Sequence, residues 1–278
     1  MSRRPDTRRS DGATVRALSF SLAACPKEAA DAFAASRARG GALGVEIALF
    51  ETALYLDSAD ALAPIAALAR REPRVALSVH GPIYDLNAGS PEPVVRDFTV
   101  RAMTAAARAT KALGASSMVV HTGFNPLLPK YVERPWCSSA GEGLAEVAKA
   151  ARAAGVDLLL ENFFDPKPET LLRLADAAGG AVEFCLDLAH VKLRSKAPFR
   201  EWLAALGSRI AEFHLNDCDG HDDQHLALGD GVCEVVPFLE AVAAGPYASA
   251  PIVLEMPLDR AQKSLAWLAE RGFVPMNA

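Results

Sequence analysis

Residues 156–187 read VDLLLENFFDPKPETLLRLADAAGGAVEFCLD and contain the arrangement that decides the fold. Two short apolar runs, Val156–Glu161 and Val182–Asp187, flank an Ala- and Leu-rich stretch over 168–178 that is suited to a helix. A strand, a helix and a second strand in this order are typical of a βαβ unit, in which the two strands run parallel. The segment therefore predicts a parallel sheet covered by helices.

The same alternation extends in both directions along the chain of 278 residues. Eight strand–helix units in about 250 residues match a single α/β domain, a (β/α)8 or TIM barrel. An open doubly wound sheet is the alternative, but no GxGxxG follows the first strand, so its dinucleotide-binding form has no support. The predicted strands are Ala17–Leu22, Val45–Phe50, Val75–His80, Ser117–His121, Val156–Glu161, Val182–Asp187, Ile210–Leu215 and Ile252–Glu255, and the predicted helices lie near 26–38, 58–71, 92–113, 139–154, 168–178, 198–207, 234–244 and 260–271.

Short signals at the helix ends agree with this division. Asp57-Ser58 and Ser138-Ser139 offer N-cap oxygens before helical stretches, and Gly114 and Gly155 stand where two helices should stop. Because the chain has no long linker, residues 13–278 are predicted to form one catalytic barrel domain. Residues 1–12, MSRRPDTRRSDG, have almost no apolar surface and are expected to form a disordered basic tail rather than a signal peptide.

Composition narrows the class of protein. A formal charge of -5 gives no support for a general polyanion binder. The five cysteines include no CxxC pair, which disfavours a disulfide framework or a cysteine-rich zinc site and favours the reducing cytoplasm. No run of about 18 apolar residues occurs, so no membrane span is expected.

Side chains of metal-binding types stand at the ends of six consecutive predicted strands. In such barrels the active groups lie at the C-terminal ends of the strands and in the loops that follow, so these side chains should converge. One His or Glu at a strand end is usually structural, but many converging carboxylates would repel one another and lose hydration unless divalent cations bound them. Imidazole and carboxylate without thiolate suit one to three ions of Zn, Mn, Co or Fe. The predicted ligands are His80, His121, Glu161, Asp187, His190, His214, Asp223, His225 and Glu255.

The residues alone leave two kinds of chemistry open. Two neighbouring ions can clamp the attacking and leaving oxygens of a displacement, whereas one ion with two flanking Glu can polarise a hydroxy-ketone while a carboxylate moves a proton. Tyr84, in a Gly-Pro loop after the third strand, and Phe124 and Trp136, assigned to the loop after the fourth, are candidate substrate-binding residues. The alternative for these aromatic side chains is packing at the rim of the barrel.

Several stretches together resemble a known superfamily. Residues 214–231, HLNDCDGHDDQHLALGDG, are similar to the H-x-N-D…D-x-H-L-x-L-G-x-G segment of the xylose isomerase-like TIM barrels, and VHGPIYDLN (79–87), VVHTG (119–123), LLLENFF (158–164) and CLDLAH (185–190) fit at the matching strands. That superfamily includes sugar and sugar-phosphate isomerases and epimerases as well as endonuclease IV. The resemblance runs from about Ala17 to Gly272.

The resemblance implies two nested sites. In its one-metal epimerases the ion is held by residues matching Glu161, Asp187, His214 and Glu255, with Glu161 and Glu255 as the catalytic acid/base pair. In endonuclease IV three zinc ions use a set that all nine predicted ligands match. The chain departs from the free-ketose epimerases at Gly220, where they carry an Arg a few residues after the strand-seven His.

Loop charge favours the isomerase or epimerase reading. The loop after the second strand, FETALYLDSAD, has no basic residue, residues 214–230 carry five Asp and no Lys or Arg, and only VKLRSKAPFR (191–200) is clearly basic. DNA enzymes need basic loops to meet phosphates. We therefore expect a divalent-metal-dependent enzyme acting on a sugar or sugar phosphate, with an endonuclease IV-like hydrolase of abasic-site DNA and a non-catalytic metal- or sugar-binding barrel as alternatives. A nucleic-acid partner is disfavoured but stays open, and the oligomeric state is undetermined.

Overall fold

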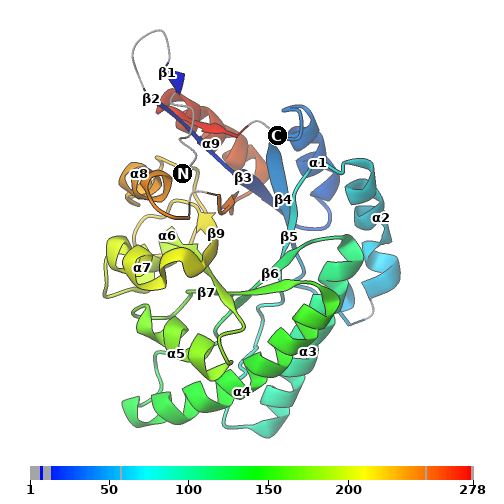
Figure 1. Ribbon diagram of the computed structural model, residues 1–278, viewed down its shortest axis with the longest axis vertical. Coiled ribbons are helices and arrows are strands. Elements are labelled where there is room, and N and C mark those ends of the chain that lie inside the picture. The colour runs from blue at the N-terminus through cyan, green and yellow to red at the C-terminus, as the bar shows by residue number, and fades with distance from the viewer. Residues whose placement is uncertain (1–6, 9–13, 57, 248, 277–278) are drawn as a thin grey trace.

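Eight parallel strands close into a barrel in the order β10-β3-β4-β5-β6-β7-β8-β9 (Figure 1). The computed structural model describes residues 7–8, 14–56, 58–247 and 249–276. Each strand pairs in parallel with the next along the chain, with a register shift between β8 and β9 at Phe184/Cys185, and β10 returns to pair with β3. The strands are β3 Phe20–Ala24, β4 Leu43–Ala48, β5 Leu77–His80, β6 Ser117–His121, β7 Asp157–Glu161, β8 Glu183–Asp187, β9 Ile210–Leu215 and β10 Ile252–Leu254. The predicted (β/α)8 barrel is confirmed.

Helices surround the barrel on the outside, and the two longest, α3 and α4, lie side by side (Figure 1). Their bounds are α1 Ala29–Arg37, α2 Ser58–Arg71, α3 Pro93–Leu113, α4 Lys130–Ala154, α5 Glu169–Ala177, α6 Leu188–Arg194, α7 Phe199–Leu206, α8 Val235–Ala244 and α9 Leu258–Glu270, with short 3-10 turns η1 Thr52–Leu54 and η2 Gly207–Arg209. Strands between a barrel interior and a helix layer are buried on both faces, which explains their continuous apolar runs.

The helix ends confirm some sequence signals and correct another. Gly114 and Gly155 follow α3 and α4 with φ of 85° and 72°, the left-handed conformation that glycine adopts without a Cβ penalty. Ser138-Ser139 is not an N-cap, because α4 begins at Lys130 and contains both serines. Asp57 lies outside the described residues, and α2 begins at Ser58.

The first predicted strand, Ala17–Leu22, divides into two elements. The barrel strand β3 begins only at Phe20, while β2, Thr14–Leu18, leaves the barrel and pairs in parallel with β11, Phe273–Pro275. Within the predicted tail, Thr7–Arg8 form β1 and pair antiparallel with β2; residues 1–6 and 9–12 lie outside the described residues. This small sheet stands beside the barrel near α9 (Figure 1).

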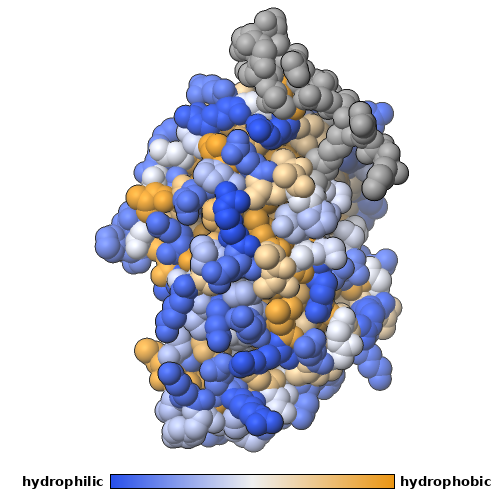
Figure 2. All heavy atoms as spheres, turned by 60° about the vertical axis from the view of Figure 1, so that its left-hand side comes forward, coloured by the Kyte–Doolittle hydropathy of each residue, from blue (hydrophilic) through white to orange (hydrophobic). Residues whose placement is uncertain are grey.

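Figure 2 shows one face of the molecule, where hydrophilic residues cover most of the surface and apolar residues are interspersed among them. Among the helices that the structure describes, none combines the length and apolarity needed to cross a membrane.

Candidate metal centre

The nine predicted ligands meet at the barrel mouth, which we define as the end formed by the C-terminal ends of the strands. Five end or immediately follow a strand, His214 lies in β9, and His190 lies on α6, whose N-cap is Asp187. Asp223 and His225 come from the loop after β9. Contacts of 3.9 Å or less link all nine into one network. The expected convergence is therefore present.

Glu161 is the hub of this network. Its Oε2 lies 3.1 Å from His80 Nε2 and 3.3 Å from His121 Nε2. Its Oε1 lies 3.2 Å from the Nδ1 atoms of both His190 and His214. A fully buried carboxylate whose two oxygens each face two imidazoles has the arrangement of a bridging ligand between two ions.

Backbone carbonyls fix the orientation of three imidazole rings. Nδ1 of His80 donates to Gly81 O at 3.1 Å, Nδ1 of His190 donates to Asn162 O at 2.8 Å, and Nδ1 of His225 donates to the carbonyl of Glu255. With Nδ1 engaged in this way, Nε2 of each ring faces the neighbouring carboxylates and would supply the lone pair to a metal once deprotonated. His225 reaches this position from a left-handed backbone, with φ of 49°.

Asp187, His190, Asp223 and His225 form the second half of the network. His190 Nε2 lies 2.9 Å from Asp223 Oδ2, and His225 Nε2 lies 3.6 Å from the same oxygen. His190 Nδ1 is 3.6 Å from Asp187 Oδ1. Asp223 therefore stands between two imidazoles in the way that Glu161 stands among four.

One buried carboxylate shapes the loop that supplies Asp223 and His225. Asp217 Oδ1 accepts hydrogen bonds from the backbone N–H groups of Cys218 and Cys233 at 3.0 and 2.9 Å. Its Oδ2 accepts two more, from Gly229 and Gly231, both at 3.0 Å. A Cβ at Gly231 would clash with the Asp217 carboxylate, so the closing turn requires glycine there.

Burial and mutual contact shift the titration of the metal-free cluster. Burial alone would lower the pKa of His80, but the hydrogen bond to Glu161 and nearby carboxylates raise it to about 9. Burial would raise the pKa of Glu161, but His214 and His121 hold it well below its ordinary value. Burial raises the pKa of Asp187 to about 7. Burial lowers the pKa of His121, so this imidazole is the exception, whereas His80 and other histidines of the cluster hold protons on nitrogens that a metal would use.

The donors fit divalent metal ions. Ligand atoms of Glu161, Asp187, His214 and Glu255 all lie within 4.8 Å of one another, as do those of His80, His121 and Glu161. Oδ1 of Asp223 is buried without a hydrogen-bond partner among the described residues, and a cation would satisfy it. Imidazole and carboxylate donors of this kind suit Zn, Mn, Co or Fe.

Two buried carboxylates beneath this cluster were not predicted from the sequence. His214 Nε2 lies 3.4 Å from Glu46 Oε2 on β4 and 3.5 Å from Glu212 Oε1 on β9. Burial and the neighbouring Glu46 raise the pKa of Glu212 to about 8, so the pair retains a proton at neutral pH. His214 Nε2 therefore faces two carboxylates inside the barrel at ion-pair distance, while Nδ1 faces the predicted metal ligands Glu161 and Glu255.

The three aromatic candidates have different surroundings. Tyr84 is 66% exposed and contacts Phe50, which in turn packs edge-on against His80. Phe124 is half-buried and packs edge-on against Trp136 at 5.3 Å. Trp136 was wrongly assigned to a loop: it lies inside α4, is 2% exposed, and donates from Nε1 to Asn87 Oδ1 at 2.8 Å. Trp136 offers a substrate no surface and instead anchors the loop after β5 to α4.

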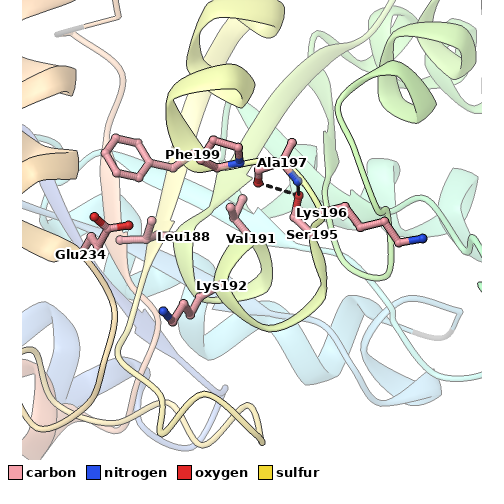
Figure 3. Close-up of a pocket in the computed structure, with 9 residues that line it drawn as sticks. Leu188, Val191, Lys192, Ser195, Lys196, Ala197, Phe199 and Glu234 are labelled. Carbon is pink, nitrogen blue, oxygen red and sulfur yellow. Dashed lines mark hydrogen bonds between the residues drawn. The ribbon is translucent and has the colours of Figure 1, made fainter.

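A separate pocket lies beside α6, on the side of the helix away from His190 (Figure 3). Leu188, Val191 and Phe199 form its apolar part, and the Lys192 and Glu234 side chains lie toward one side of it. Leu188, Val191, Lys192 and Ser195 follow one face of the helix, and none of the lining residues belongs to the metal-ligand set.

Comparison with known proteins defines the family. A model of the xylose isomerase-like TIM barrel family matches residues 33–271, and the chain belongs to this family. The TTHB071 protein from Thermus thermophilus, whose structure followed soaking with ZnCl2, is 34% identical, with a TM-score of 0.77 over 91% of this chain and 98% of that one. A D-tagatose 3-epimerase-like protein is 24% identical, with a TM-score of 0.74 over 90% of this chain and 96% of that one, a likeness of fold alone.

Curated relatives match over shorter segments. The uncharacterized protein MJ1311 of Methanocaldococcus jannaschii is 29% identical over 174 residues, which span 60% of this chain and 59% of that protein. The probable endonuclease 4 of Solibacter usitatus is 26% identical over 207 residues, which span 63% of this chain and 68% of that protein. Both enzyme classes suggested by the sequence thus have counterparts among the similar proteins.

Proposed function

We propose that this protein is a divalent-metal-dependent isomerase or epimerase acting on a sugar or sugar phosphate. The observation that carries the proposal is the group Glu161, Asp187, His214 and Glu255, whose ligand atoms lie within 4.8 Å of one another. Two of its members are glutamates that come from separate strands, β7 and the end of β10, and are able to exchange protons with a bound substrate. The D-tagatose 3-epimerase-like fold and other epimerase folds among the similar structures support this choice.

The bound metal would polarise a hydroxy-ketone, which acidifies the hydrogen on the neighbouring carbon. Glu255 is the proposed base that accepts that hydrogen as a proton. Glu161 is the second proposed proton-transfer group. If one carboxylate removes the proton and the other returns a proton to the opposite face of the carbon, the configuration inverts with no net change in atoms or charge.

Tyr84 and Phe124 are the proposed substrate-binding residues. Tyr84 is exposed next to the Phe50–His80 contact, and Phe124 follows a turn in which its N–H donates to Thr122 Oγ1 at 3.2 Å. Apolar ring faces at such positions suit the C–H faces of a sugar. We also propose a cytoplasmic location, because all five cysteines are free thiols.

The test is conversion of a panel of ketoses and ketose phosphates by the full chain loaded with Mn²⁺, Co²⁺ or Zn²⁺. We expect inversion or isomerisation of at least one compound, with solvent deuterium incorporated at the reacting carbon. Glu255→Gln should abolish turnover while Glu240→Gln, an exposed change at the Arg16 ion pair, should not. Absence of deuterium incorporation with every compound and metal would overturn the proposal.

The second candidate is an endonuclease IV-like phosphodiester hydrolase. The observation that favours it is that all nine ligands form one network, more groups than a single ion uses, and the probable endonuclease 4 relative agrees. Its three zinc ions would take the full set. The metal dependence of either activity is part of the proposal.

Charge near the mouth weighs against this second candidate. Asp219 and Asp222, in the loop after β9, are exposed and would repel a phosphate backbone. The charge is smaller than the sequence implied, because Asp217 is buried and Asp230 pairs with Lys263 at 2.6 Å. We expect little or no incision of an abasic-site duplex at low salt by the zinc-loaded protein. Efficient incision that is lost in Glu161→Gln would support the nuclease function instead.

A further inference from the structure

Arg194 ends α6 at the edge of the metal-ligand network. It follows His190 by four residues on the same helix, so the two side chains share one helix face, one turn apart. The opposite face of α6 carries Lys192 and lines the separate pocket of Figure 3. Of the cations on this helix, Arg194 is therefore the one directed to the side of the ligands.

Two aromatic rings hold the Arg194 guanidinium. It lies 4.5 Å from the ring centre of Phe164 and 5.3 Å from that of Phe163. The Phe163 ring is stacked on His121 at 4.5 Å and packs edge-on against His190 at 4.8 Å. One phenyl ring thus separates the guanidinium from two proposed metal ligands.

The surroundings of the Arg194 guanidinium leave its charge unpaired by any described residue. Within the part of the chain that the structure describes, Arg194 makes no ion pair, and its buried Nε has no hydrogen-bond partner. Arg194 packs against aromatic rings beside a carboxylate-rich site but pairs with none of those carboxylates. Its N–H donors are therefore available to a bound ligand. Its planar donor edge matches the oxygens of a phosphate or a carboxylate.

We propose that Arg194 binds the anionic end of the substrate, so that the enzyme acts on a sugar carrying a phosphate or a carboxylate rather than on a neutral sugar. This inference rests on the proposed isomerase or epimerase function and adds the substrate class. The hydroxy-ketone end lies at the metal ligands, the carbon chain passes along Phe163, and the anionic group meets the guanidinium. Arg194 acts as a specificity-determining residue and takes no part in proton transfer.

The experiment measures binding by calorimetry to the full chain loaded with Mn²⁺, which needs no turnover. The probes are D-fructose, D-fructose 6-phosphate and a ketohexuronate. The variants are Arg194→Gln, Arg194→Lys and, as matched control, Lys192→Gln, which removes one charge from the other face of α6. We expect one anionic sugar to bind at least about tenfold tighter than fructose, since a charge-assisted bidentate contact is added.

Arg194→Gln should reduce that preference to about twofold or less without changing the affinity for fructose. Arg194→Lys should retain part of the preference, because an ammonium keeps the charge but lacks the planar pair of donors of a guanidinium. Lys192→Gln should keep the full preference. A preference for the phosphate or for the uronate supports the proposal and assigns the anion. Equal binding of all three probes, binding of none, or a preference that survives Arg194→Gln overturns it. Arg194-dependent binding with no turnover of any ketose leaves this subsite standing and refutes the proposed reaction, whereas turnover of neutral ketoses alone does the reverse.

Discussion

Glu161 is the residue on which the proposed metal centre depends most, because its two carboxylate oxygens face four imidazoles. Glu161→Gln retains the volume but replaces one oxygen by an amide group that repels both imidazolium and metal. We expect metal affinity to fall by more than about 100-fold, beyond the usual effect of outer-shell changes, with loss of turnover. Zinc competition with a chelating dye measures this, and an unchanged zinc stoichiometry in Glu161→Gln would contradict it.

Glu46 and Glu212 are the residues to test for an orienting role. Changing both to Gln removes the negative charge facing His214 Nε2 while preserving side-chain volume. We expect metal affinity to fall by about 10- to 100-fold, the range found for outer-shell partners. Ser78→Ala, which removes only a 3.5 Å contact to Glu46, is the control and should change affinity little. Equal zinc affinity in the double variant and in Ser78→Ala would refute the orienting role.

The ligands were predictable from sequence because each stands at or just after a strand end, where a parallel barrel gathers its side chains. Glu46 and Glu212 were not, since they lie within strands that are buried on both faces and show no alternation. Glu212 did carry one usable signal: it precedes His214 by two residues and therefore points to the same side of β9. The proposed role of Arg194 was not predicted, because it depends on ring contacts between separate elements, which no spacing in the sequence encodes.

The loop after β9 is folded around the buried carboxylate of Asp217. Asp217→Asn replaces an acceptor oxygen by a donor and leaves buried N–H groups unpaired. We expect a loss of roughly 2–4 kcal/mol in the free energy of unfolding and weaker binding of any ion at the proposed ligands Asp223 and His225. Urea denaturation and zinc stoichiometry measure the two effects. Asp219→Asn, an exposed change in the same loop, should be nearly neutral, and equal effects of the two substitutions would argue against this account.

Local sequence signals predicted some helix boundaries correctly and missed others. The alternation of strands and helices gave the correct number of barrel units, and Gly114 and Gly155 marked two helix ends because a left-handed residue favours glycine. The start of α4 was missed by nine residues, from the predicted 139 to Lys130, since Pro135 and the two serines resemble a loop followed by a cap. Tertiary contacts of Trp136 with Asn87 and Gly89 outweigh those preferences.

The charge state of the site affects the stability of the whole molecule. His80 and His225 have pKa values raised to about 9, and those of Asp187 and Glu212 are raised to about 7 and 8. A group with a raised pKa in the folded state stabilises the fold below its unfolded pKa and loses that contribution as the pH rises through the folded value. The raised carboxyl groups therefore lower the stability of the metal-free protein as the pH rises from about 4 to 8, and the two histidines add a further loss between about pH 6.5 and 9.

Thermal unfolding with EDTA should show a Tm that falls by roughly 4 °C or more across this window, since each kcal/mol corresponds to about 2–4 °C in a domain of this size. The lowered pKa of Glu255, about 2, matters only in acid and does not oppose the trend. With saturating zinc the nitrogens are already deprotonated, so Tm should stay nearly constant. Parallel pH profiles with and without zinc would contradict this prediction.

The position of Glu255 just beyond β10 has a consequence for how the protein comes into being. On the ribosome β10 is the last barrel strand to emerge, and it is the one that joins β9 to β3. A nascent chain that ends before it has His80, His121 and Glu161 but not the complete four-residue group. If these groups hold an ion as proposed, full metal affinity would develop only after β10 has closed the barrel, and a metal present during synthesis would stabilise the closed barrel against reopening.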